Sequence, residues 1–310
     1  MTADRMTYPH RRRGLDHDWF VHEPTFKRAP LIWPDGKRVA LWITVPVEFF
    51  PLNAPTQPVR PLGGLDRVYP DFWSYSNRDY GTRIGIYRIM RVLDPLGLRA
   101  TAAVNAAIAT HYPRLIDEIV RRNWEIVANG IDMGQVHHGK LNLDDERELI
   151  KRARETLTNA SGKHIAGWHS PGHSQSGNTL SLLAENKFEY VVDWANDDAP
   201  YMMKTAAGPL CAIPLTYEWS DRVLLVQHNL TVEDYEAQVL QAFKRLHAEA
   251  VKHRAGRILS LSISPWILGY PHRISTLVRV LSKILDGGSV WNATSMEIVS
   301  AFKMQTCRTT

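Results

Sequence analysis

Residues 39–45 read VALWITV, an uncharged run that is rich in β-branched side chains. Because β-branched residues favour extended backbone, this run predicts a β-strand. Apolar residues fill it almost continuously, without the alternation of a strand that has one face in water. Continuous runs are typical of strands covered on both sides, which occur in parallel sheets wrapped by helices. The stretch therefore predicts an α/β fold.

The same kind of run recurs along the chain, and segments of helical periodicity separate the runs. The further β-rich runs cover residues 99–104, 124–128, 165–168, 190–194, 211–215, 257–263 and 289–291. The helical segments cover residues 83–94, 113–122, 143–160, 176–187, 232–253, 273–286 and 294–303. About seven or eight β/α units over this length favour a closed barrel over an open sheet.

The composition is that of an ordinary globular protein. Hydrophobic residues make up 44% and charged residues 22% of the 310 residues, which excludes disordered, collagen-like and small disulfide-rich proteins. We predict a single barrel domain over residues 36–310, preceded by a polar N-terminal arm over residues 1–35. Residues 50–76 are rich in Pro, Gly and aromatic residues and too long for a simple loop. We predict that they cover one barrel mouth as a lid or substrate wall.

Charge and apolar patterning bear on partners and location. The formal charge is +5, from 37 Lys and Arg against 32 Asp and Glu, and no basic stripe interleaved with aromatics indicates nucleic-acid binding. No run approaches the roughly 18 apolar residues that a membrane span needs, and the N-terminus lacks the apolar core of a signal peptide. The distant pair Cys211 and Cys307 indicates neither a disulfide framework nor a Cys-based zinc site. We therefore expect a cytoplasmic protein with a small-molecule substrate and no nucleic-acid or membrane partner.

Polar residues gather just after the predicted strands. In a β/α barrel the carboxyl ends of the strands meet at one mouth, where catalytic residues sit. Because the same residue types are sparse within the strands, this concentration of His, Asp and Glu is the main chemical signal. The residues are Glu48, Asn105, Asn129, Asp132, His137, His138, His169, His173, Asp193, Asn196, Asp197, Asp198, Glu218, Ser264 and Trp266.

Several of these residues also have a purely structural explanation. Asn105, Asn129 and Asp193 could cap a following helix or bind loop amides. The adjacent His137 and His138 project differently in any regular backbone, so a solvated surface loop is the alternative to a shared role. Both interpretations stay open from the sequence.

Five stretches, in this order, resemble the polysaccharide deacetylase (NodB-homology) superfamily, and specifically its branch that includes cofactor-free allantoinase and cyclic imide hydrolase. They are RVALWITVPVEFFP (38–51), RDYGTRIGIYRIMRVLDPLGLRATAAVNA (78–106), WEIVANGIDM (124–133), GWHSPGHSQSGNTLSLLAENKFEYVVDWANDDAPY (167–201) and SPWILGYPHRI (264–274). The resemblance implies a distorted (β/α) barrel of about seven strands, similar to the TIM barrel. It also implies a homo-oligomer, because symmetric assemblies are common in the allantoinase branch.

The resemblance further implies where a metal sits in the metal-dependent members. Their strand-one motif is rich in Asp and supplies the base and one ligand, whereas this chain keeps only Glu48 there. Their next motif has two histidines four residues apart, which correspond here to Asn129 and Met133. A thioether is a poor substitute for imidazole in a zinc-like site. We therefore predict no metal ligands and no cofactor, with a divalent, zinc-like metal as the alternative.

Two more family positions are substituted. The Arg of the family's R-x-P-G motif corresponds to His169, and the general-acid histidine after strand seven corresponds to Ser264. A serine hydroxyl alone cannot replace imidazole as a proton donor at neutral pH. Either other groups have taken over the chemistry, or the chemistry has been lost.

We predict metal-independent hydrolysis of a nonpeptide carbon–nitrogen bond in a small amide, imide or ureide. This reaction needs a base for water, donors for the oxyanion and an acid for the leaving nitrogen. Glu48 or Asp132 is the predicted base, and Asn129 with loop amides is the predicted oxyanion donor. His169 or His137 is the predicted acid. Substrate contacts are predicted for Trp73, Tyr80, His138, His173, Trp194, Asp197, Ser264 and Trp266.

Two alternative functions remain from the sequence. One is a catalytically silent family member that binds a carbohydrate-like or ring ligand. The other is a metal-dependent deacetylase whose ligands have moved to Glu48, Asp132, His137 and His138. Saturable ligand binding without product would favour the first, and stoichiometric metal in the purified protein would favour the second.

Overall fold

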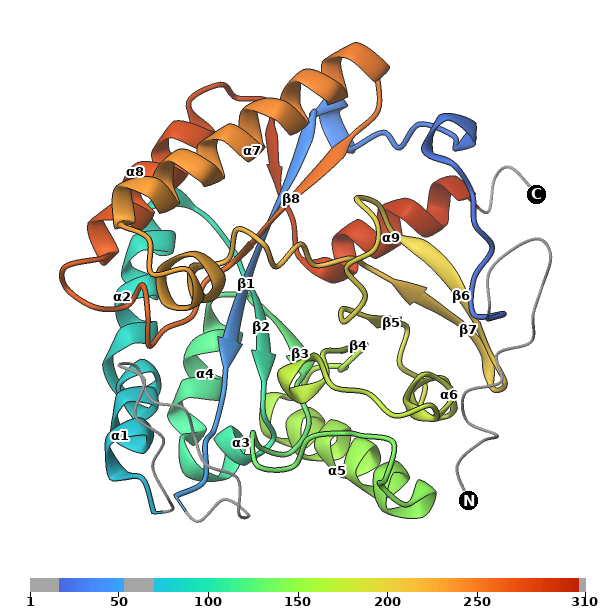
Figure 1. The fold of residues 1–310 in the computed structure, drawn as a ribbon, viewed down its shortest axis with the longest axis vertical. Coiled ribbons are helices and arrows are strands. Elements are labelled where there is room, and N and C mark those ends of the chain that lie inside the picture. Colours follow the sequence, from blue (N-terminus) through green and yellow to red (C-terminus); the bar gives the residue numbers. More distant parts are fainter. Residues whose placement is uncertain (1–16, 53–69, 307–310) are drawn as a thin grey trace.

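The structure is a computed structural model that describes residues 17–52 and 70–306. A curled sheet of nine strands lies at its centre and helices surround it (Figure 1). The order is β6-β7-β5-β4-β3-β2-β1-β8, with β9 paired to β1. The strands are β1 (Val39–Val47), β2 (Thr101–Val104), β3 (Glu125–Ala128), β4 (Gly167–Trp168), β5 (Tyr190–Val191), β6 (Tyr201–Thr205), β7 (Gly208–Ala212), β8 (Arg257–Ser262) and β9 (Val290–Asn292).

The predicted distorted (β/α) barrel is confirmed. Neighbouring strands are parallel from β7 through β1 to β8, and β6 joins β7 as an antiparallel hairpin. Within the described ranges the two ends of the sheet, β6 and β8, do not pair. Strand pairing among the described residues therefore leaves the curled wall open, whereas the number of β/α units favoured a closed barrel.

The helices alternate with the strands and flank the outside of the curl, most visibly α2, α4, α5, α7 and α8 (Figure 1). This placement covers the outer face of the sheet, as a parallel β/α sheet requires. The helices are α1 (Phe72–Tyr80), α2 (Ile86–Leu93), α3 (Ala107–His111), α4 (Pro113–Arg121), α5 (Leu143–Ser161), α6 (Thr179–Glu185), α7 (Val232–His253), α8 (Ile274–Leu285) and α9 (Ser295–Thr306).

Capping residues set the bounds of the two longest helices. The side chain of Asn142 accepts a hydrogen bond from the Asp144 amide at the start of α5. Thr231 and Asp234 bond each other's backbone amides in a capping box at the start of α7. Gly162 ends α5 with a φ of 64°, a left-handed conformation that glycine adopts without strain.

The side chains of β1 alternate between two buried layers. Its odd-numbered residues 39–47 pack outward beneath the helices, whereas Ala40 and Trp42 pack inward in a second core that includes α9. Both faces are buried, which explains the continuous apolar run in the sequence. Thr44 and Glu48 are on the same inward face as Ala40 and Trp42, and they line a cavity. The inside of the curl thus becomes polar toward the carboxyl ends of the strands.

Among the α-helices and strands that the structure describes, three were not predicted from the sequence: α1, α3 and β6. Helix α1 includes residues 72–76, the last part of the predicted lid. Residues 53–69 of that lid lie outside the described residues. The edge strand β6 alternates between exposed and buried positions, so it lacks the continuous apolar run by which the inner strands were found.

The described part of the predicted N-terminal arm lies along the barrel. The buried Trp33 indole donates a 2.9 Å hydrogen bond to the Arg257 carbonyl at the start of β8. Earlier in the arm, the Trp19 carbonyl accepts a 2.6 Å hydrogen bond from the Lys204 amide in β6. Among the helices that the structure describes, none has the length and apolar character needed to cross a membrane.

Candidate active site

A cavity lies inside the curl at the carboxyl ends of the strands. Its apolar walls come from Trp42, Val127, Val192 and Leu215. Of the residues predicted for the site, Glu48, His169, His173 and Ser264 line it. Tyr217 and Arg222 add two polar groups that were not predicted.

Glu48 and Arg222 face each other across this cavity. Glu48 follows the last residue of β1, and its side chain is 9% exposed. The Arg222 guanidinium, at the start of a π-helical turn, lies 3.9 Å from Glu48 Oε1. Burial alone would lower the pKa of Arg222, but the charge of Glu48 and a hydrogen bond with Tyr217 outweigh it and raise that pKa. The guanidinium is therefore a fixed positive charge in the wall.

Two histidines and an aspartate form a second group at the cavity. His169 directly follows β4, and its Nε2 lies 3.2 Å from Nδ1 of His173. The same two atoms lie 3.9 Å and 4.0 Å from Asp193 Oδ1. Burial lowers the pKa of each histidine to about 4. Both imidazoles are therefore neutral at physiological pH.

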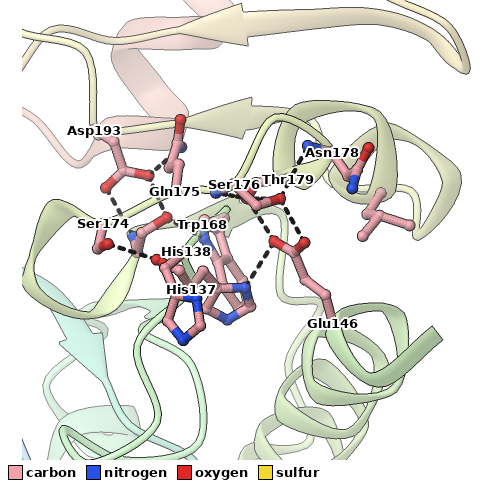
Figure 2. Close-up of polar contacts among 12 residues, drawn as sticks. His137, His138, Glu146, Trp168, Ser174, Gln175, Ser176, Asn178, Thr179 and Asp193 are labelled. Atoms are coloured by element: carbon pink, nitrogen blue, oxygen red, sulfur yellow. Dashed lines mark hydrogen bonds and ion pairs between the residues drawn. The ribbon is translucent and has the colours of Figure 1, made fainter. Parts of the chain in front are cut away.

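Hydrogen bonds hold Asp193 in place beside the histidines. The amide and the hydroxyl of Ser170 and the side-chain amide of Gln175 each donate a 2.7 Å bond to its carboxylate. Gln175 in turn accepts a 3.2 Å bond from the Trp194 indole. Burial raises the pKa of Asp193 above its usual range. Gln175 lies on the loop that follows β4, and Asp193 lies two residues beyond β5; Figure 2 shows the bond between their side chains.

A second buried carboxyl lies behind the cavity wall. Asp221 is fully buried, and its Oδ2 accepts a 2.7 Å bond from the Ser264 amide. Within the described part of the chain, its Oδ1 has no hydrogen-bond partner. Burial raises the pKa of Asp221 to about 7. Asp221 therefore titrates near neutral pH, next to Ser264, a residue that lines the cavity.

His137 lies outside the cavity, in a buried polar cluster (Figure 2). Its Nδ1 is 2.9 Å from Glu146 Oε1, and the two side chains are 1% and 0% exposed. Ser176 and Thr179 also donate hydrogen bonds to Glu146. Burial alone would raise the pKa of Glu146, but these bonds outweigh it and lower that pKa. The cluster ties the loop after β3 to α5 and to the loop that carries His173.

Asp132 and Asn129 also lie outside the cavity lining. The Asp132 carboxylate accepts bonds from the Gly134 amide and the Gln135 side chain. It therefore shapes its own loop. Asn129 is buried at the end of β3, and its Oδ1 has no hydrogen-bond partner among the residues that the structure describes.

The residues predicted as a relocated metal set do not come together. Glu48 lines the cavity, whereas Asp132 and His137 bond within or beneath the loop after β3. His138 is exposed on that same loop. These four side chains therefore form no common site.

Three predicted substrate contacts belong to the packing around α1. Trp73 is exposed on α1, and Tyr80 stacks on Tyr270 with ring centroids 4.2 Å apart. Trp266 is buried, and the Arg78 guanidinium lies 4.4 Å from its ring centroid. None of the three lines the cavity.

Two more predicted substrate contacts hold the N-terminal arm. Trp194 packs edge-on against Trp19 and Phe20, with ring centroids 5.4 Å and 6.0 Å away. Asp197 forms an ion pair with Arg28, with Nη2 and Oδ2 2.6 Å apart. Both residues therefore stabilise the contact between arm and barrel.

Sequence reasoning missed Tyr217, Asp221 and Arg222, which follow β7. From this stretch it selected only Glu218, which is exposed. Tyr217 is two residues beyond Leu215, which faces inward, so the period of two could have identified it. The positions of Asp221 and Arg222 depend on the π-helical turn, for which the sequence carries no comparable signal.

Known proteins share this fold. Residues 75–191 match the family model of polysaccharide deacetylase. The predicted resemblance to this superfamily is confirmed. Among solved structures, Puue allantoinase superposes with a TM-score of 0.78 and 22% identity, over 89% of this chain and 94% of that protein.

Two further structures, both named as polysaccharide deacetylases, give similar results. One, from Pseudomonas aeruginosa PAO1, has a TM-score of 0.77 at 23% identity, over 87% of this chain and 92% of its own. The other, from Mycobacterium smegmatis, has a TM-score of 0.75 at 23% identity, over 90% of this chain and 95% of its own. At these identities the likeness establishes the fold. No curated protein matches the chain significantly.

In this deacetylase-like barrel, the positions that the resemblance assigns to the metal do not suit one. Glu48 lines the cavity, but Asn129 is outside its lining, and Met133 offers only a thioether. The Met133 amide instead bonds the Phe49 carbonyl. An amide and a thioether are poor ligands for a zinc-like ion. These positions therefore do not fit a zinc-like ion.

Proposed function

We propose that this chain hydrolyses a nonpeptide carbon–nitrogen bond in a small amide, imide or ureide. The observation that carries the proposal is the juxtaposition of Glu48, Arg222 and Ser264 in one cavity at the strand ends. The fold shared with Puue allantoinase supports this reaction class, because opening a ureide ring breaks such a bond.

Glu48 is the proposed base. Its carboxylate is held at the cavity wall and can accept a proton from a water molecule beside it. Arg222, at 3.9 Å, fixes the position of this carboxylate without a close contact. The carboxylate oxygens are thus left to bind water.

Arg222 and Tyr217 are the proposed oxyanion donors. A guanidinium carries five N–H groups in a rigid fork, more than its contacts with Glu48 and Tyr217 occupy. Donors fixed in advance in a site with little water stabilise the charge of a tetrahedral intermediate strongly. Both side chains line the same cavity as Glu48.

Ser264, backed by Asp221, is the proposed proton donor for the leaving nitrogen. A serine hydroxyl alone is too weak an acid. When the Ser264 hydroxyl gives its proton to the leaving nitrogen, Asp221 can give its carboxyl proton to the serine oxygen. The pKa of about 7 suits Asp221 to this relay near neutral pH. His169 is less suitable, because a pKa of about 4 leaves its imidazole neutral. The acid role proposed here therefore differs from the sequence prediction of His169 or His137.

The walls of the cavity favour a flat, partly polar ring. Trp42, Val127 and Leu215 contribute apolar residues to the cavity lining, and Arg222 and Ser264 contribute polar ones. Cyclic imides and ureides combine a planar ring with carbonyl groups. Ring strain and a stable leaving group also lower the demand on a catalyst.

The test is turnover by the purified full-length protein of allantoin, succinimide-type rings and N-acetyl sugars. We expect ring opening of a cyclic imide or ureide, detected as a new carboxylate by liquid chromatography, and no acetate from the sugars. Glu48→Gln should abolish the ring opening. Absence of product from every compound would contradict the proposal.

A catalytically silent protein that binds a ring or carbohydrate-like ligand is the second candidate. Ser264 favours it, because it stands at the position that the resemblance assigns to a general-acid histidine. Calorimetric titration of the same compounds, together with the turnover assay, distinguishes the silent protein from the hydrolase. Saturable binding without product would select the silent protein.

A further inference from the structure

His169, His173 and Asp193 form a group of metal-binding side chains that the proposed hydrolysis does not use. Each offers one donor atom, and these atoms all lie within 4.8 Å of one another. We propose that this group binds one zinc-like divalent metal ion. The site is new relative to the family's metal positions, because none of those positions contributes to it.

The distances among the three donor atoms suit a single ion. His169 Nε2 and His173 Nδ1 are 3.2 Å apart, and they lie 3.9 Å and 4.0 Å from Asp193 Oδ1. A tetrahedral ion with bonds of about 2.0 to 2.2 Å needs donor atoms roughly 3.3 to 3.6 Å apart. Shifts of less than about half an ångström would therefore complete the coordination.

A tight turn brings the two imidazoles together edge-on, with ring centroids 4.5 Å apart. His169 follows β4, and Pro171–His173 forms a 3-10 turn in which Gly172 has a φ of 64° and His173 a φ of 56°. Residues other than glycine rarely adopt this left-handed conformation. The surrounding structure keeps His173 in it, and in this conformation its Nδ1 faces His169.

The carboxylate of Asp193 is oriented as a ligand would need. Its Oδ2 accepts the bonds from the Ser170 hydroxyl and from Gln175. Within the described residues its Oδ1, near both imidazoles, accepts only the Ser170 amide. One lone pair of Oδ1 therefore remains for a metal. Hydrogen bonds of this kind fix the orientation of ligands in known metal sites.

The group leaves a coordination position open toward the cavity. His169, Gly172 and His173 form part of the cavity wall, and the Tyr217 ring packs against His173 with centroids 4.9 Å apart. Three protein ligands and an open fourth position are typical of catalytic zinc sites. A bound metal would polarise a substrate carbonyl as a Lewis acid. That use rests on the proposed function, whereas metal binding itself does not.

Donor type and local charge indicate the class of metal. Imidazole ligands favour zinc, cobalt or nickel over magnesium or calcium, which prefer oxygen alone. Asp193 and Glu48 each bring a carboxylate to this part of the barrel, and Arg222 brings one positive charge. The remaining negative charge attracts a cation.

The experiment is calorimetric titration of Zn²⁺ into the full-length protein after treatment with a chelator. We expect one equivalent of zinc to bind, and Co²⁺ to give visible absorption bands of a four-coordinate site. His173→Gln and Asp193→Asn each remove one donor and should weaken zinc binding at least about 100-fold. His138→Gln is the matched control, because it removes an exposed histidine that lies outside the group. It should leave the affinity unchanged.

Circular dichroism establishes that each variant is folded, and His169→Gln replaces either variant that is not. Absence of stoichiometric zinc, or equal affinity in His173→Gln, Asp193→Asn and the control, would overturn the proposal. The two imidazoles would then simply share an N–H···N hydrogen bond. Zinc binding without turnover would uphold this inference and contradict the proposed function. Turnover by protein that binds no zinc would do the reverse.

Discussion

The Ser264 amide donates a 2.7 Å hydrogen bond to Asp221 Oδ2 inside the barrel wall, where Asp221 has no contact with solvent. This bond joins the loop after β8 to the turn that follows β7. It places a carboxyl group whose pKa is raised to about 7 directly behind a residue that lines the cavity. Both the stability of the fold and the proposed proton relay should depend on the protonation of this group.

Asp221→Asn should change how stability depends on pH. Between the usual pKa of 3.8 and about 7, folded Asp221 holds a proton that the unfolded chain has released. The free energy of unfolding of the wild type should therefore fall across this range relative to the variant, by up to about 4 kcal/mol. Urea denaturation of both proteins at about pH 5 and about pH 8 covers the upper part of this range, where the expected fall is about 3 kcal/mol. A constant difference at the two pH values would contradict it.

Asp221 should also set the alkaline limit of activity. If it returns the proton to Ser264, kcat/KM should decline as the pH rises above about 7. Ser264→Ala interrupts the relay but keeps the backbone bond to Asp221, so it should lower kcat and remove this decline. The measurement is the pH profile of ring opening for wild type and variant. An identical profile in both would exclude the relay.

Arg222→Lys should reduce turnover although it keeps the positive charge. Lysine cannot reproduce the rigid fork that contacts both Glu48 and Tyr217. We expect kcat to fall by about 100-fold or more, with a smaller change in KM. Arg91→Lys, an exposed position on α2, is the control and should behave as wild type. Equal kcat values in the two variants would remove Arg222 from the oxyanion role.

Glu146→Ala should destabilise the protein because it breaks a buried polar cluster. The substitution leaves His137, Ser176 and Thr179 without their common acceptor. Loss of one member of such a buried pair costs about 3 to 5 kcal/mol. Thermal and urea unfolding should show this loss, whereas Glu148→Ala, exposed on the same helix, should stay close to wild type. Similar stability of the two variants would show that the cluster contributes little.

The inner part of the fold could be predicted from the sequence because both faces of its strands are buried. The continuous run at residues 39–45 is the clearest case, since its side chains fill two apolar layers. The edge strand β6 has one exposed side and thus no such run. Helix α1 is largely polar and lies in a stretch dominated by Pro, Gly and aromatic residues, where a period of 3.6 is not apparent.

Site residues could be predicted only close to the end of a strand, where the alternation of side chains along the strand still fixes which way a residue points. Glu48 has the inward phase of Thr44, and His169 directly follows a strand, so both could be placed at the cavity. His137 lies nine residues beyond β3, where strand phase no longer fixes direction, and it points to Glu146 instead. His173 reaches the cavity because of a left-handed turn, which the pattern of residues does not encode.

The most direct test of the central claim is the steady-state kcat of Glu48→Gln beside that of Glu218→Gln, on the ring compound that the wild type opens fastest. The two variants lose the same charge, but only Glu48 lines the cavity, while Glu218 is exposed. Our account predicts a loss of at least about 100-fold for Glu48→Gln and nearly wild-type turnover for Glu218→Gln. Full turnover by Glu48→Gln would contradict it.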